Sequence, residues 1–253
     1  MPCEAIISDW NGTLFEYATD EALNRRLGYR ALFDDVTAVL TGRFWKIADV
    51  AKLLRAKAQL EKRLRQYYRG ERHLQEVYEP FNESVLKGRP VAFVERVIDR
   101  FARESADKVD KRVLRPIRKA HENGKFTGIL SGSYDYSIKR ILEESGFSDV
   151  FDVVVANTLQ TNGNEAVCLT FRIYGRKTEV LIEEFFKKRG FRENNTVYLG
   201  DSKDDEQIAE ILTPGNFIVP FLARDEFKQR MASKYKAFVP ESEEDLMKYL
   251  QSR

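Results

Sequence analysis

Short apolar runs alternate with amphipathic helical patterns along the second half of the chain, and few folds are compatible with that alternation. The apolar runs are typical of buried strands and cover Phe126–Leu130, Val153–Ala156, Thr196–Gly200 and Phe217–Val219. Helices are predicted over Ser133–Ser145 and Lys177–Arg189, each followed directly by a glycine. This order predicts an α/β protein with a Rossmann-like, doubly wound and mostly parallel sheet that has helices on both faces.

The first part of the chain departs from this pattern. Glu4–Asp9 is a short apolar run that ends in an acid, as a buried strand does where it opens into a site. From about residue 16 to 106, apolar residues recur at three- and four-residue spacing with no clear strand, and breaks are expected at Pro80 and at Gly88–Pro90. We therefore predict an inserted all-helical cap domain over residues 16–106 and an α/β core domain made of residues 1–15 and 107–253.

Charge and composition exclude several classes of protein. Lysine and arginine number 42 against 40 acidic residues, so the chain lacks the overall positive field of a nucleic-acid-binding protein. The two cysteines and two histidines match no zinc-ligand spacing. No apolar stretch reaches the length of a membrane span, and the first residues show no secretory pattern. We expect a cytoplasmic protein with reduced thiols, no membrane partner and no nucleic-acid partner, while the oligomeric state stays open.

A basic run lies within the predicted cap. Between Arg43 and Arg72, ten basic residues stand against three acids. A solvated helix face is the commoner meaning of such a run. The alternative is that some of these cations face the sheet and attract an anionic substrate.

Acidic residues follow two of the predicted strands. Asp9 comes directly after the first strand, and Asp201, Asp204 and Asp205 follow the strand Thr196–Gly200. Because the carboxyl ends of parallel strands share one edge of a sheet, these carboxylates are expected to converge. Like charges at close range repel one another unless a cation lies among them, and hard oxygen ligands favour Mg²⁺.

Two further features suit a phosphate group at the same edge. Ser131 and Gly132 end the second core strand with a hydroxyl and backbone amides that lead into a helix, an arrangement that receives a phosphate oxygen. Lys177 begins another helix and supplies an ammonium. Taken singly, these residues have ordinary roles as a helix cap or a solvated lysine. Their common order and position favour a phosphoryl-transfer site.

In this order, the four elements resemble the four motifs of the haloacid dehalogenase superfamily. The elements are Asp9–Thr13, Ser131–Ser133, Lys177 and Gly200–Asp205. The helical insertion after the first motif and the stretch Ser131–Tyr136 are similar to the phosphoserine-phosphatase-like branch of that superfamily. The resemblance implies a Mg²⁺-dependent phosphatase that acts on a small phosphorylated substrate through an aspartyl phosphate on Asp9.

The resemblance also implies roles for individual residues. The catalytic residues would be Asp9, Asn11 and Lys177. Asp201 would ligate Mg²⁺ together with Asp9 and the main-chain carbonyl of Asn11, and Asp205 would join the metal site through water or by fixing Lys177. The residues implied in phosphate binding are Asn11, Gly12, Thr13, Ser131, Gly132 and Lys177.

Asn11 departs from the family pattern. In phosphatases of this superfamily the position usually carries a second aspartate, which protonates the leaving alcohol and then activates the hydrolytic water. An amide cannot carry that proton. Three functions stay open: a phosphohydrolase for a small phosphorylated metabolite, a weak or inactive homologue that binds phosphate or a metabolite, and a phosphotransferase. The sequence does not identify the cap residues that would select a substrate.

Overall fold

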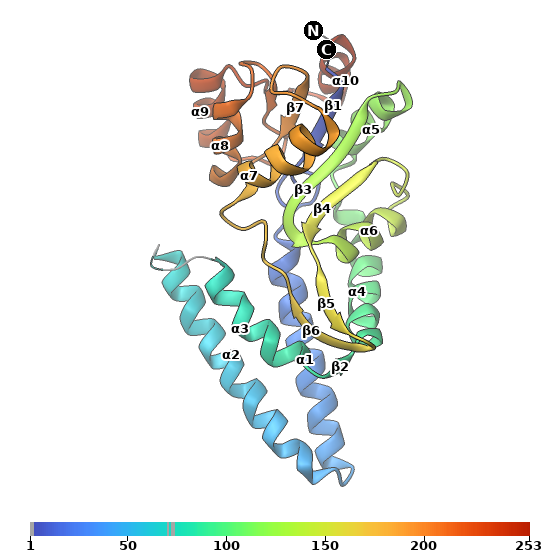
Figure 1. Cartoon of the computed structure of the whole chain (residues 1–253), viewed down its shortest axis with the longest axis vertical. Helices are drawn as coiled ribbons and strands as arrows, with labels where there is room; N and C mark the ends of the chain where they lie inside the picture. Colours follow the sequence, from blue (N-terminus) through green and yellow to red (C-terminus); the bar gives the residue numbers. More distant parts are fainter. Residues whose placement is uncertain (1–2, 70, 72–73) are drawn as a thin grey trace. The chain divides into compact units, whose positions relative to one another are not determined.

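The chain divides into two compact units in the computed structural model, which describes residues 3–69, 71 and 74–253 (Figure 1). The α/β unit comprises Met1–Thr19, Ala102–Ala156 and Gly175–Arg253, and the helical unit comprises Asp20–Phe101 and Asn157–Tyr174. This division differs from the predicted core and cap boundaries mainly in the segment 157–174. Among the described residues, no helix is both long and apolar enough to cross a membrane.

A central sheet organises the α/β unit, with the described strands in the order β4-β3-β1-β7-β8. Their bounds are β1 (Ala5–Ser8), β3 (Phe126–Tyr134), β4 (Val153–Asn157), β7 (Thr196–Leu199) and β8 (Phe217–Ile218). β1 pairs in parallel with β3 on one side and with β7 on the other, and β7 pairs in parallel with β8. All of β1 is buried, as expected for a central strand covered on both faces. The predicted mostly parallel α/β fold is confirmed.

Helices accompany the strands of this unit, and side chains cap several of them. They are α5 (Lys111–Glu122), α6 (Asp135–Glu144), α7 (Lys177–Leu181) with a π-helical continuation (Ile182–Lys187), α8 (Lys203–Ile211), α9 (Asp225–Tyr235) and α10 (Glu243–Ser252). Asp110 accepts a hydrogen bond from the backbone amide of Arg112 at the start of α5. Ser202 and Asp205 form a capping box at the start of α8. These caps satisfy amides that have no partner within the helix.

Two boundaries in this unit differ from the prediction. β3 continues to Tyr134, and α6 therefore begins at Asp135 and not at Ser133, because Ser131 and Ser133 stay buried in extended backbone. The helix predicted over 177–189 changes to π-helical hydrogen bonding at Ile182.

The helical unit contains long helices and a small antiparallel sheet. The helices are α1 (Thr19–Leu40), α2 (Ile47–Tyr68), α3 (Leu74–Leu86) and α4 (Val91–Ser105), with a 3₁₀ turn at Phe44–Lys46. The sheet has the order β2-β6-β5, formed by β2 (Arg89–Pro90), β6 (Glu165–Leu169) and β5 (Leu159–Asn162). The segment 157–174 joins this unit because β6 pairs with β2 and packs on α3. The region predicted to hold no clear strand thus contributes β2.

Pro80 lies inside α3 and does not break the helix, contrary to the prediction. A proline in a helix interior removes a backbone hydrogen bond. Val77, Phe81 and Val85 of the same helix are buried, and α3 packs on α2 and β6. This burial offsets the lost bond, because most helical stability in proteins comes from packing.

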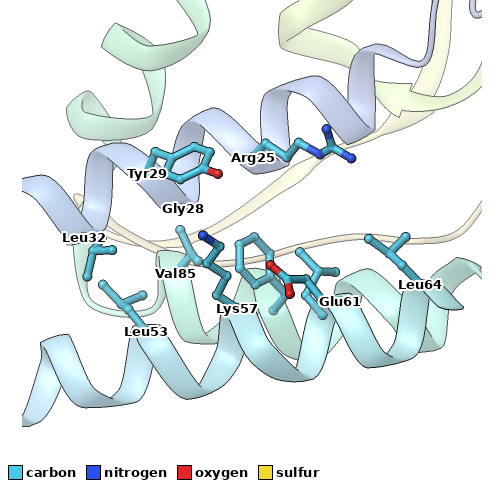
Figure 2. A pocket seen from close by; sticks show the side chains of 11 residues that line it. Arg25, Gly28, Tyr29, Leu32, Leu53, Lys57, Glu61, Leu64 and Val85 are labelled. Carbon is cyan, nitrogen blue, oxygen red and sulfur yellow. The ribbon is translucent and has the colours of Figure 1, made fainter.

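An apolar groove of about 290 Å³ opens between α1, α2 and α3 (Figure 2). Leu32, Leu53 and Phe81 are among its lining residues. Gly28 allows α1 to pack closely on α3, because a Cβ at this position would lie 2.6 Å from Phe81 Cζ. Lys57 extends from α2 toward α1, and its Nζ lies 5.0 Å from the centre of the Tyr29 ring (Figure 2).

Candidate active site

Three carboxylates meet at the carboxyl ends of β1 and β7. Asp9 follows β1, Asp201 follows β7 after one glycine, and Asp205 lies in the first turn of α8. The register that pairs Ser8 with Leu199 brings the two strand ends together. One carboxylate oxygen of each acid lies within 4.8 Å of the others. The structure therefore assembles three of the four acids that were expected to converge, and Asp204 is not among them.

Lys177 joins the three acids from the first turn of α7. Its Nζ lies 3.0 Å from Asp9 Oδ1 and 2.6 Å from Asp205 Oδ1. Its side chain is only 10% exposed, so the two carboxylates replace the water that the ammonium loses. Burial by itself lowers the pKa of Lys177, but the charges of Asp205 and Asp9 outweigh burial and hold this pKa above its ordinary value. Lys177 is therefore charged at neutral pH.

The acids carry more negative charge than Lys177 balances. Burial raises the pKa of Asp9 to about 8; the charges of Asp205 and Asp201 add to the rise, while Lys177 opposes it. Burial likewise raises the pKa of Asp201 to about 6, again with a contribution from Asp205. Raised carboxylate pKa values mean that a further positive charge is stabilised at this site. The oxygen donors present fit Mg²⁺, the metal that the sequence resemblance implies.

The turn after β1 passes close to the carboxylate of Asp201 at Gly12. Gly12 has a φ of +70°, and a Cβ on it would lie 2.1 Å from Asp201 Oδ2. Thr13 Oγ1 donates a hydrogen bond to Asp201 Oδ1 at 3.2 Å. Glycine both adopts this backbone conformation without strain and leaves room for the carboxylate.

Hydroxyl groups hold the side chain of Asn11. Its Oδ1 accepts hydrogen bonds from the backbone amide and from Oγ1 of Thr19, both at 2.9 Å. Its Nδ2 donates to Ser133 Oγ at 2.9 Å, and the backbone amide of Ser133 donates to Ser131 Oγ at 3.1 Å. Because the Thr19 amide can only donate, the oxygen of the Asn11 side chain must face the start of α1.

Of the other predicted residues, Ser131 and Gly132 lie at the edge of the sheet that carries Asp9, whereas Asp204 points to solvent. Ser131 and Gly132 are on β3, and its parallel register with β1 carries them to the same edge of the sheet as Asp9. Asp204 is exposed in the first turn of α8, where it complements the helix dipole. The functional roles assigned to these residues stay predictions.

Three residues that support the site were not predicted from the sequence. They are Thr19, which holds Asn11, and Tyr198 and Ser202, which both donate hydrogen bonds to Asp205. Tyr198 gives the clearest signal, because a tyrosine in a buried strand needs a partner for its hydroxyl. Thr19 and Ser202 offer no signal beyond ordinary helix-start chemistry.

Comparison with known protein families identifies the family of this chain. The family model described as haloacid dehalogenase-like hydrolase matches residues 6–210. The match runs from β1 into α8 and so includes Asp9, Lys177 and the acids that follow β7. The chain belongs to the haloacid dehalogenase-like hydrolase family.

Individual relatives are phosphoserine phosphatases. One from Archaeoglobus fulgidus is 28% identical over 169 residues, which cover 65% of this chain and 45% of the relative. The chain thus spans about half the length of this curated relative. A substrate-bound phosphoserine phosphatase complex is similar in structure, with 18% identity, coverage of 98% of this chain and 99% of that chain, and a TM-score of 0.60.

A second similar structure is a phospho-aspartyl intermediate analogue of phosphoserine phosphatase. It shares 18% identity with this chain, the match covers 100% of this chain and 99% of that chain, and the TM-score is 0.59. At this identity both structures support the fold alone.

Replacing Gly12 with alanine is expected to weaken Mg²⁺ binding at least about tenfold, because the new Cβ displaces Asp201. The measurement is the rise in melting temperature as Mg²⁺ is added to metal-free protein. Gly124→Ala is the matched control: Gly124 has a φ of +84°, and nothing lies within 4 Å of a Cβ built there. Both variants carry similar backbone strain, so an equal Mg²⁺ response in the two would contradict a cation site at Asp201.

Proposed function

We propose that the protein is a Mg²⁺-dependent phosphohydrolase that removes phosphate from a small phosphorylated metabolite through an aspartyl phosphate on Asp9. The observation that carries this proposal is the buried Asp9 carboxylate, 3.0 Å from the Lys177 ammonium at the edge where two more acids meet. A phosphomonoester dianion approaches a carboxylate only where positive charge compensates the repulsion. Membership of the hydrolase family and the phosphoserine phosphatase relative support the same reaction.

The reaction has two steps. In the first, an oxygen of Asp9 forms a bond to phosphorus while the bond between phosphorus and the ester oxygen breaks, and the leaving oxygen takes a proton from solvent to become an alcohol. In the second, the oxygen of a water molecule forms a bond to phosphorus while the bond between phosphorus and the Asp9 oxygen breaks; the proton of the water passes to solvent, inorganic phosphate leaves and Asp9 regains its carboxylate. Lys177, Ser131 and the turn Asn11–Thr13 would hold the phosphate oxygens throughout. Mg²⁺ held by Asp9, Asp201 and the main-chain carbonyl of Asn11 would supply further charge compensation.

Asn11 limits the proton transfers in both steps. Its amide neither gives nor takes a proton at neutral pH. We therefore expect slow turnover of alkyl phosphates and faster turnover of aryl phosphates, because an aryl oxide leaves without a proton. The same side chain favours two alternatives: a phosphotransferase that passes the group to another alcohol, or a protein that binds the phosphorylated ligand with little turnover.

Phosphate release is expected to require Mg²⁺ and to fall at least about a hundredfold when the metal is removed. The full chain is incubated with para-nitrophenyl phosphate, with O-phosphoserine and with a panel of other phosphorylated metabolites, each with Mg²⁺ and with EDTA. Recovery of the rate when excess Mg²⁺ is added back controls for damage by the chelator. Equal rates with and without Mg²⁺ contradict the metal requirement, and ligand binding without phosphate release favours the binding protein.

A further inference from the structure

A tyrosine hydroxyl reaches the acids from inside the central sheet. Tyr198 lies on β7 and is fully buried, and its hydroxyl donates to Asp205 Oδ1 at 2.8 Å. Its ring packs against the Phe217 ring with 5.8 Å between centroids. Burial and the neighbouring Asp205 charge raise the pKa of Tyr198 well above its ordinary value, so the phenol stays a hydrogen-bond donor. The two reaction steps described above make no use of this hydroxyl.

Protein donors surround both oxygens of Asp205. Oδ1 accepts from Lys177 Nζ at 2.6 Å and from the Tyr198 hydroxyl at 2.8 Å. Oδ2 accepts from Ser202 Oγ at 2.7 Å and from the Ser202 backbone amide at 3.2 Å. A carboxylate oxygen offers about two acceptor positions, so these four contacts occupy the whole group.

We propose that Tyr198 is a positioning residue that holds Asp205, and through it the Lys177 ammonium, beside Asp9. This inference rests on the function proposed above. Ser202 anchors Oδ2 at the start of α8, whereas Tyr198 anchors Oδ1, the oxygen that Lys177 contacts. With both oxygens held, the carboxylate keeps its orientation and the ammonium stays between the two acids. Asp205 then serves the metal site through Lys177 and not as a ligand.

Tyr198→Phe removes the hydroxyl and keeps the ring, so it tests the inference directly. Hydrogen bonds to charged groups are among the stronger ones in proteins. Because the loss of this bond lets Asp205, and with it Lys177, move away from Asp9, kcat is expected to fall about tenfold. The half-saturating Mg²⁺ concentration is expected to change less than about twofold, because Asp205 does not ligate the metal. A lower kcat with an unchanged Mg²⁺ requirement supports the inference. A change confined to the Mg²⁺ requirement overturns it, because that result identifies Asp205 as a ligand.

Tyr249→Phe is the matched control in the same unit. The Tyr249 hydroxyl donates to the backbone oxygen of Gly215, so this variant also loses one phenol hydrogen bond, but away from the acids. We expect both variants to melt a few degrees below the natural protein and only Tyr198→Phe to lose kcat. Equal values of kcat in the two variants contradict the positioning role.

A second measurement does not depend on turnover. Lys177 and Tyr198 donate to the same oxygen of Asp205, so removing one increases the dependence of the buried carboxylate on the other. In metal-free protein, Tyr198→Phe is therefore expected to lower the melting temperature more in a Lys177→Met background than in the natural chain. If Tyr198→Phe lowers the melting temperature equally in the two backgrounds, Tyr198 and Lys177 do not hold Asp205 together and the inference is contradicted.

If Lys177→Met does not fold, the same comparison is made in an Asp205→Asn background. In that background the Tyr198 hydroxyl faces a neutral amide, so Tyr198→Phe is expected to cost less melting temperature than in the natural chain. An equal cost overturns the inference. These melting cycles also separate two failures: if the natural protein releases no phosphate from any substrate, the proposed function fails, while the cycles still report whether Tyr198 and Lys177 share Asp205.

Discussion

Asp9→Asn is expected to lower phosphate release from an aryl phosphate at least about a thousandfold, because an amide oxygen is a poor nucleophile and forms no stable bond to phosphorus. Asparagine has nearly the same shape as aspartate, so the burial and the position of the strand end are retained. Lys177 keeps its shorter contact, to Asp205, and remains buried and charged. The measurement is the initial rate of phosphate release at saturating Mg²⁺, compared with that of the natural chain.

Asp225→Asn provides the matched control, because Asp225 lies in the same unit with a side chain that is 89% exposed. This variant changes the net charge in the same way and is expected to leave the rate unchanged. Asp9 also contributes to the cation site, so both variants are compared at several Mg²⁺ concentrations. A rate that recovers at high Mg²⁺ assigns Asp9 to metal binding alone and rejects it as the nucleophile. A rate that stays low at all concentrations supports the aspartyl phosphate.

The central sheet follows from local sequence patterns. Its buried strands appear as apolar runs, and parallel strands must present their carboxyl ends at one edge. That geometry alone predicts that Asp9 and Asp201 converge, and one oxygen from each indeed lies within 4.8 Å of the other. The end of β3 was less predictable, because Ser131–Ser133 carries the composition of a helix start but remains extended, with the side chains of Ser131 and Ser133 buried.

The helical unit shows where local patterns stop being informative. β2 is only two residues long, and its pairing with β6 joins segments far apart in the sequence. Arg89 of that strand lies 2.5 Å from Asp35 Oδ2 on α1, a contact that no spacing in the sequence indicates. Pro80 predicts a break in the helix, but α3 continues through it because the helix packs on α2 and β6. Tertiary contacts decide these features, and the sequence taken by itself does not reveal them.

The candidate site shows the same limit. Asp9, Lys177 and Asp205 carry ionisable side chains and lie at the ends of predicted strands or the starts of predicted helices, so the sequence identifies them as candidates. Tyr198 acts by donating one hydrogen bond to Asp205, and Thr19 acts by donating two to Asn11, from its backbone amide and its hydroxyl. Such contacts depend on side-chain directions that are fixed only when the strands and helices have packed. A buried tyrosine hydroxyl predicts that some partner exists and does not say which one.

Asn11→Asp is expected to raise turnover of alkyl phosphates about a hundredfold to ten-thousandfold, the usual contribution of a positioned general acid and base. The new carboxylate fits the present contacts: one oxygen keeps the hydrogen bonds from the amide and hydroxyl of Thr19. The other replaces Nδ2 beside Ser133 Oγ, and the serine hydroxyl can rotate to donate to it. The exchange therefore adds a proton carrier without requiring the backbone to move.

The dependence on the leaving group makes this prediction specific. An alkoxide needs a proton to leave, so the gain from Asn11→Asp is expected to be larger for O-phosphoserine than for para-nitrophenyl phosphate. Asn123→Asp, at the exposed C-terminal end of α5 in the same unit, controls for the added charge and is expected to change neither rate. An equal gain with both substrates points to an altered hydrolysis step and not to protonation of the alcohol. No gain with either substrate shows that more than one proton carrier is missing, and it makes ligand binding without turnover the better account of this chain.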